Sequence, residues 1–178
     1  MSVPRLDPMP ADRPLTLRSA RTQDVPVIQA LVEPLARERV LLQKEAVAYY
    51  EAIQEFVVAE EADGTLAGFG ALHVMWQDIA EVRTLAVSEA HRGAGVGHLI
   101  IEELLDRARA VGVERVFCLT FEVDFFSRHG FHEIEGQAVE PAVYIELLRS
   151  YDEGVAEFLD LERVKPNTLG NSRMLLEL

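Results

Sequence analysis

Three glycines in five residues mark the part of the chain best suited to bind an anion. The segment Arg92-Gly93-Ala94-Gly95-Val96-Gly97 follows an apolar run typical of a strand and opens a long amphipathic pattern typical of a helix. Glycine lets the backbone approach a ligand closely and adopt dihedral angles denied to other residues. The first turn of a helix also offers unpaired N–H groups and the positive end of the helix dipole. We therefore expect these six residues, with His98 after them, to bind a pyrophosphate.

The spacing of the glycines separates this turn from two other phosphate-binding turns. A dinucleotide fingerprint needs G-x-G-x-x-G, but counting from Gly93 the last position is His98. A P-loop ends in Gly-Lys followed by Ser or Thr, and the chain contains no such pair. The alternative is a glycine-rich connector that binds nothing.

The segments before the turn predict a sheet whose middle strands form an antiparallel meander. Thr22 is expected to cap a first helix that buries a stripe of apolar residues, and a second short helix is expected at residues 44–54. The strands are predicted by apolar runs separated by short turns. These runs are Leu15–Ala20, Phe56–Glu60, Leu66–Trp76 and Ala80–Val87.

The segments after the turn predict a long helix followed by further strands. Ile100, Leu104, Ala108 and Val111 fall on one face of that helix, and Gly112 is expected to end it. A strand at residues 116–120, a helical turn, a helix at residues 142–150 and a last strand at residues 172–178 complete the pattern. Together these elements predict a mixed α/β fold with one central sheet.

Length and composition limit the class of protein. The 178 residues suffice for one domain, expected at residues 14–178 after a loose leader at residues 1–13. The formal net charge of −13 argues against broad nucleic-acid binding. A single cysteine, Cys118, excludes an internal disulfide and favours a reducing compartment. No apolar run approaches the roughly 20 residues of a membrane span, so we expect a cytoplasmic protein that binds neither membrane nor nucleic acid.

At the glycine-rich turn the sequence resembles the GNAT superfamily of acetyltransferases. Their R/Q-x-x-G-x-G/A motif is matched by Arg92, Gly95 and Gly97, and FFSRHGF (Phe125–Phe131) is similar to their segment before the sixth strand. This resemblance implies an α/β (α+β) GNAT fold, acetyl-CoA as co-substrate, and fourth and fifth strands that splay apart. It places Leu85, Ala86 and Val87 along the pantetheine arm and Phe126 at the cofactor.

Several segments further resemble the acetyltransferase part of N-acetylglutamate synthase, above all its short, stand-alone bacterial relatives. They are EVRTLAV, VFCLTFEVDFFSRHGF and GVAEFLDLERVKPNTLGNSRMLL. The resemblance implies acetylation of the α-amine of glutamate or glutamine as the first step of arginine biosynthesis. It also implies a homodimer.

The same resemblance implies catalytic roles for two residues. Glu81 matches the proposed base at the start of the fourth strand, where partial burial would raise its pKa; the alternative is a solvated carboxylate. Thr120 matches a hydroxyl that could act as the acid, because Phe126 occupies the position where many members have a tyrosine. The alternative for Thr120 is a strand residue that hydrogen-bonds to backbone.

The carboxylates of the substrate need cationic partners. Lys44 matches a basic substrate-binding position of the family, and Arg83, with Thr84 beside it, shares the face of Glu81 by strand alternation. A second basic position of the family falls near Gly170, so Arg173 or Lys165 could replace it, or the site could suit a side-chain amide.

The sequence also fits other functions. His91, His98, His129 and His132, four of the five histidines, lack the spacing of metal ligands, so no metal is expected. An acetyltransferase for another amine, such as a protein N-terminus, a polyamine or a xenobiotic, is the nearest alternative. A non-catalytic acyl-CoA or amino-acid sensor would bind without turnover, and a structural interaction domain would not bind acetyl-CoA at all.

Overall fold

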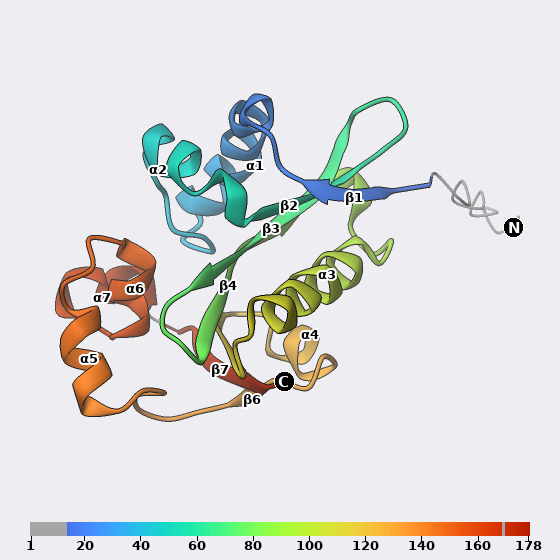
Figure 1. The fold of residues 1–178 in the computed structure, drawn as a ribbon. Coiled ribbons are helices and arrows are strands. Elements are labelled where there is room, and N and C mark those ends of the chain that lie inside the picture. Colours follow the sequence, from blue (N-terminus) through green and yellow to red (C-terminus); the bar gives the residue numbers. More distant parts are fainter. Residues whose placement is uncertain (1–13, 169) are drawn as a thin grey trace, which may run out of the picture.

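A seven-stranded sheet in the order β1-β2-β3-β4-β5-β7-β6 organises the chain (Figure 1). The computed structural model describes residues 14–168 and 170–178, so the predicted leader at residues 1–13 lies outside the described residues. Neighbouring strands pair antiparallel except β4 and β5, which are parallel. The strands are β1 (Thr16–Ser19), β2 (Phe56–Glu60), β3 (Leu66–Val74), β4 (Ile79–Val87), β5 (Arg115–Thr120), β6 (His132–Glu133) and β7 (Ser172–Glu177).

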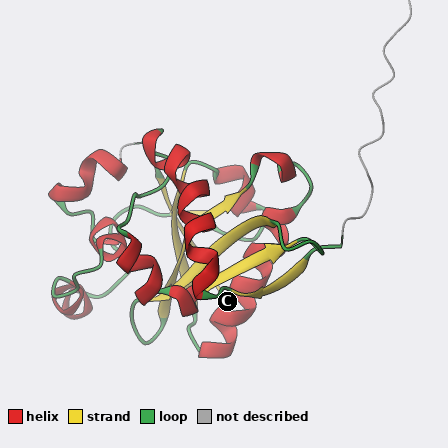
Figure 2. Cartoon of the chain, turned by 90° about the horizontal axis from the view of Figure 1, so that it is seen from above, coloured by secondary structure: helices red, strands yellow, loops and turns green. Residues whose placement is uncertain are grey.

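Helices cover both faces of the sheet (Figures 1 and 2). The long helix α3 packs on one face with α4, whereas α1, α2 and the group α5–α7 pack on the other. Their bounds are α1 (Val25–Arg37), α2 (Ala46–Glu51), α3 (Val96–Val111), α4 (Val123–Ser127), α5 (Pro141–Leu147), α6 (Glu153–Phe158) and α7 (Lys165–Thr168). Short 3-10 turns η1 to η4 occupy Thr22–Asp24, Ile53–Glu55, Glu89–His91 and Glu162–Val164.

Two glycines of β3 let α3 approach the sheet closely. A Cβ atom added at Gly68 or Gly70 would lie 3.0 Å from the Ile100 side chain, and at Gly70 also 3.0 Å from that of Leu104. Those distances are below ordinary van der Waals contact, so larger residues would push the helix outward. The helix that carries the glycine-rich turn is thereby fixed against the middle of the sheet.

Most of the expected elements are present, and two local expectations are wrong. The meander of β2, β3 and β4 is confirmed, and Gly112 ends α3 with φ +87°. Thr22 does not cap the first helix: the Asp24 carboxylate accepts the Arg21 N–H at 2.7 Å, and α1 begins only at Val25. Val111, the last residue of α3 before Gly112, is 60% exposed and is not part of the buried face.

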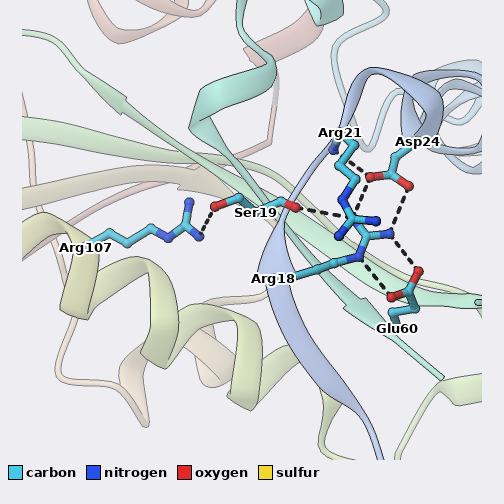
Figure 3. A network of polar contacts seen from close by, with 6 residues as sticks. All are labelled: Arg18, Ser19, Arg21, Asp24, Glu60 and Arg107. Carbon is cyan, nitrogen blue, oxygen red and sulfur yellow. Dashed lines mark hydrogen bonds and ion pairs between the residues drawn. The ribbon is translucent and has the colours of Figure 1, made fainter. Parts of the chain in front are cut away.

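An ion-pair cluster ties the edge strand β1 to its neighbours (Figure 3). Arg18 donates to Asp24 and to Glu60, each at a shortest distance of 2.7 Å. The Arg18 side chain is 14% exposed and that of Asp24 is 7% exposed, so water screens this pair weakly. Hydrogen bonds from Arg18 hold the pKa of Asp24 below its ordinary value. The cluster thus joins β1, β2 and the residue that precedes α1.

Candidate active site

The parallel strands β4 and β5 separate partway along their length. Their pairing ends where Glu81 lies opposite Phe117, yet β4 continues to Val87 and β5 to Thr120. The predicted splay of the fourth and fifth strands is therefore present. It opens a gap between the two faces of the sheet immediately beyond Glu81.

A bulge in β4 at Thr84 changes which side chains point to each face. The register with β3 shifts there, and Thr84 has φ +55°, an unfavourable angle for a β-branched residue. Arg83 points to the face covered by α6, but Leu85 and Val87 pack with the α3 face. Without the bulge, strand alternation would place all three on one face. One strand thus presents these side chains to both faces of the sheet.

Glu81 is a carboxylate withdrawn from water. The residue is 3% exposed, and its Oε2 atom has no hydrogen-bond partner within the described part of the chain. Burial raises the pKa of Glu81, and the cation in contact with it, Arg83 Nη1, is 3.8 Å from Oε2. This arrangement contradicts the alternative of a solvated strand-end carboxylate and gives a group suited to accept a proton.

Arg83 is held by carboxylates from two other elements. Its Nη1 donates to Asp152 at 2.6 Å and its Nη2 to Glu55 at 3.1 Å. Asp152 also caps α6 by accepting the Val155 N–H at 2.9 Å. The positive charge of Arg83 is therefore compensated by the protein itself.

A cavity of about 60 Å³, partly open to solvent, lies beside Glu81. Lys44 contributes its ammonium group, which has no ion pair or hydrogen bond among residues 14–168 and 170–178, and burial lowers its pKa. The cavity therefore contains a cation without a fixed partner and a buried carboxylate. Its lining comprises Val40, Leu41, Leu42, Lys44, Glu81, Val82, Arg83, Thr84, Leu119, Gly154, Glu157 and Asn171.

Two residues predicted from the sequence are engaged elsewhere. The Thr120 hydroxyl accepts the Glu122 N–H at 2.8 Å, which is the backbone contact considered as its alternative role. Arg173 donates to the carbonyl oxygen of Phe158 at 2.7 Å, and its guanidinium lies 4.9 Å from the centre of the Phe117 ring. Neither is part of the cavity lining. Arg173 thus anchors the end of α6 to the sheet, and it is not a free cation for the substrate as the sequence had suggested.

Other lining residues were missed by the sequence reasoning. Gly154, Glu157 and Asn171 come from the segment between β6 and β7, where the sequence predicted a single helix at residues 142–150. The acidic i, i+4 pair of α6, Glu153 and Glu157, is too short a pattern to have indicated a site. The resemblance near residues 154–174 was the available signal.

The glycine-rich turn has the backbone expected for an anion site. Gly93 and Gly95 have φ +77° and +80°, and Gly95 is the residue before the first turn of α3. A Cβ at Gly97 would lie 3.3 Å from the Phe125 ring, so this ring packs on the turn. Phe126, predicted to contact the cofactor, is instead 5% exposed and packs on Phe131 in the core. Adjacent residues of a short helix point in different directions, and Phe125 is the one that faces the turn.

A histidine pair lies at the same end of α3. His98 Nδ1 and His129 Nε2 are 2.7 Å apart, and the ring centres of His98 and Phe125 are 4.9 Å apart. Burial, followed by the neighbouring His98, lowers the pKa of His129. The pair brings together two histidines that are 31 residues apart in the sequence. Within the described residues no group of three or more His, Cys, Asp or Glu side chains is placed to hold a metal ion.

Known proteins similar to this chain share one type of chemistry. A model of the acetyltransferase (GNAT) family matches residues 27–133. The chain is 56% identical over 171 residues to the amino-acid acetyltransferase of Mycobacterium tuberculosis. This match covers 95% of this chain and 98% of that protein. It is 33% identical over 119 residues to the amino-acid acetyltransferase of Neisseria meningitidis, covering 66% of this chain and 27% of that protein.

Solved structures agree with the sequence relatives. The crystal structure of Rv2747 from Mycobacterium tuberculosis, in complex with CoA and NLQ, matches with a TM-score of 0.88 and 57% identity. That match covers 92% of this chain and 99% of the other. N-acetylglutamate synthase from Neisseria gonorrhoeae, complexed with coenzyme A and N-acetyl-glutamate, has the same fold with a TM-score of 0.73 at 24% identity. There the match covers 94% of this chain and 36% of the larger one.

Proposed function

The chain belongs to the acetyltransferase (GNAT) family, and on this premise we propose that it acetylates the α-amine of glutamine or glutamate beside Glu81. The observation that carries the proposal is the Oε2 atom of Glu81, buried without a hydrogen bond where β4 and β5 separate. A base at this point lies between the cavity on one face and the glycine-rich turn on the other. It can therefore reach an amine that attacks through the gap.

The residues on the α3 face fit acetyl-CoA, which supplies an acetyl group activated as a thioester. Gly93, Gly95 and the first N–H groups of α3 suit the pyrophosphate, and the side chain of Arg92 adds positive charge. Leu85 and Val87 point to the same face and suit the pantetheine arm. On the opposite face, Glu81 accepts a proton from the substrate nitrogen, while Thr84 fixes the bulge between the two sides.

The charges of the cavity favour a substrate with one carboxylate. Lys44 is available to bind the α-carboxylate, whereas the charge of Arg83 is already balanced by Asp152 and Glu55. Glu157 adds a further carboxylate to the lining. A glutamate side chain would need a second free cation, but the side-chain amide of glutamine needs only hydrogen-bonding groups such as Asn171. We expect glutamine to be the better of the two substrates.

A substrate panel tests this function. The purified chain is incubated with acetyl-CoA and, separately, with glutamine, glutamate, aspartate, lysine, a polyamine and a peptide with a free N-terminus. The products are identified by mass spectrometry. We expect N-acetylglutamine, and N-acetylglutamate at lower kcat/KM. Acetylation of the polyamine or peptide alone would contradict the proposal, and binding of acetyl-CoA without any product would indicate a sensor.

The proposed reaction suggests a metabolic pathway and a cellular compartment. Acetylation of the α-amine protects glutamate-family amino acids during synthesis of arginine, and we propose that the enzyme acts at the first step of that pathway. The buried free thiol of Cys118 and the use of acetyl-CoA support a cytoplasmic location. No helix in the described part of the chain is long and apolar enough to cross a membrane. The resemblance to N-acetylglutamate synthase supports a homodimer, which light scattering on the purified protein would test.

A further inference from the structure

Glu157 lies on the wall of the cavity that contains Glu81. It follows Gly154 by three residues in α6, and residues three apart share one face of a helix. Gly154 packs directly on the catalytic face of β4: a Cβ there would lie 2.6 Å from Arg83 Nη1 and 3.3 Å from Glu81 Oε2. Both Gly154 and Glu157 line the cavity with Lys44 and Glu81. The helix thus carries a second carboxylate to the site.

The environment of Glu157 suits a group that exchanges protons. Its carboxylate has no hydrogen bond or ion pair within residues 14–168 and 170–178, and the residue is half-buried. Burial, followed by the charge of Glu81, raises the pKa of Glu157 to about 7. The other charged groups around it are Lys44 on the facing loop, Asp152 and Glu153 on its own helix, and Arg173, which donates to its backbone carbonyl. Near neutral pH the two forms of Glu157 are therefore both populated.

The reaction requires more than one proton acceptor. An α-ammonium must lose one proton before it can attack and a second when the amide nitrogen is formed. One of these protons finally resides on the sulfur of CoA, and the other leaves the protein. Glu81 is 3% exposed, whereas Glu157, which lines the same cavity, is only half-buried and can exchange its proton with water.

We propose that Glu157 is a second catalytic carboxylate, which takes the first proton of the bound α-ammonium and releases it to solvent. The inference rests on the proposed function. The N–H bond of the ammonium breaks as an O–H bond forms on Glu157, and the nitrogen lone pair then attacks the thioester carbon. As the C–N bond forms and the C–S bond breaks, Glu81 takes the second proton and gives it to the departing thiolate. Glu157 returns to its ionised form by losing its proton to water.

The test compares pH profiles of kcat/KM for Glu157→Gln and the unaltered enzyme with glutamine. The unaltered enzyme should gain activity as the pH rises through about 7, because Glu157 accepts a proton only when ionised. Glu157→Gln should lower kcat/KM at neutral pH by roughly 10²-fold. Its activity should recover as alkaline pH supplies free amine, and the step near pH 7 should be lost.

Controls separate this inference from effects on folding or on the function itself. Glu162→Gln removes an exposed carboxylate of η4 and should leave the profile unchanged. Acetyl-CoA affinity and Tm of Glu157→Gln should match the unaltered enzyme. A carboxyl-carbon NMR titration should assign a pKa near 7 to Glu157 without reference to activity. A Glu157→Gln enzyme with the unaltered profile, or with activity lowered equally at every pH, would overturn the inference. Absence of acetylation by the unaltered enzyme would instead refute the proposed function.

Discussion

At the scale of single residues, burial moves two opposite charges toward their neutral forms. The pKa of Glu81 is raised and that of Lys44 is lowered, in both cases chiefly because these groups are withdrawn from water. A raised carboxyl pKa favours proton transfer from an amine, and a partly desolvated ammonium strengthens its attraction to a substrate carboxylate. Binding and proton removal are thus assigned to different side chains of the same cavity.

Lys44→Met should affect the amino-acid substrate and leave acetyl-CoA unaffected. Methionine keeps most of the apolar length of lysine but lacks the charge that pairs with the α-carboxylate. A hydrogen bond to a charged group contributes about 1.5–3 kcal/mol, so KM for glutamine should rise roughly 10- to 100-fold. Steady-state kinetics with each substrate varied in turn measures this. Lys165→Met, which removes a half-exposed lysine paired with Asp160, is the matched control. A rise in the KM of acetyl-CoA alone would contradict this prediction, because it would show that Lys44 contacts acetyl-CoA and not the amino acid.

Several site residues could be predicted from the sequence because their signal is local. Arg92 to Gly97 and the strand around Glu81 are defined by neighbours in the chain, and both are found where the pattern placed them. Glu157 has no such signal, since its role depends on α6 packing against β4. The His98–His129 contact joins residues 31 positions apart, and the direction of the Arg173 side chain is decided by carbonyl groups of α6. Such tertiary contacts leave no periodic pattern in the sequence.

At the scale of elements, β4 and α6 together shape the site. The bulge at Thr84 divides β4 into a part that faces the cavity and a part that faces α3. Helix α6 has only six residues and would be unstable alone. It is held by its Asp152 cap, by the ion pair of Asp152 with Arg83, and by the bond from Arg173 to Phe158. Those long-range contacts explain why this helix was not predicted.

Gly154→Ala should lower activity with little effect on stability. The added methyl group would lie 2.6 Å from Arg83 Nη1, so the guanidinium must move away. This movement displaces the hydrogen bond from Arg83 to Asp152. Alanine otherwise favours the helix relative to glycine. We expect kcat/KM for glutamine to fall about tenfold, as small misplacements in active sites do, with Tm nearly unchanged. Glu153→Ala, at an exposed position of the same helix, should change neither. Full activity of Gly154→Ala would show that Arg83 can move without consequence.

At the scale of the whole molecule, one sheet holds the glycine-rich turn and the cavity on its two opposite faces. The α3 face presents the glycine-rich turn and the opposite face presents the cavity, with the gap between β4 and β5 connecting them. The resemblance to a known superfamily made this architecture predictable from the sequence. The Arg18 cluster stabilises the edge of the same sheet far from the cavity, so its loss tests stability separately from catalysis.

Asp24→Asn should destabilise the protein in a pH-dependent way. The substitution removes one carboxylate from a part-buried cluster in which Glu60 still pairs with Arg18, so we expect it to cost about 1.5 kcal/mol, measured as the free energy of unfolding in urea at neutral pH. The pKa of Asp24 is lower in the fold than its ordinary value of 3.8, so its contribution is complete above that value. It is lost as the pH falls through the folded-state pKa. The difference between Asp24→Asn and the unaltered protein should therefore shrink in acid, and a difference independent of pH would contradict this assignment.

The most direct test of the account is the rate of CoA thiol release from acetyl-CoA with glutamine, compared between the unaltered chain and Glu81→Gln. The substitution keeps the shape of the side chain but removes the proton acceptor at the end of the β4–β5 pairing. We predict that kcat falls by roughly 10²- to 10⁴-fold while acetyl-CoA affinity is retained. Unchanged thiol release by Glu81→Gln would contradict the central claim that the buried carboxylate at the splayed strands accepts a proton from the attacking nitrogen.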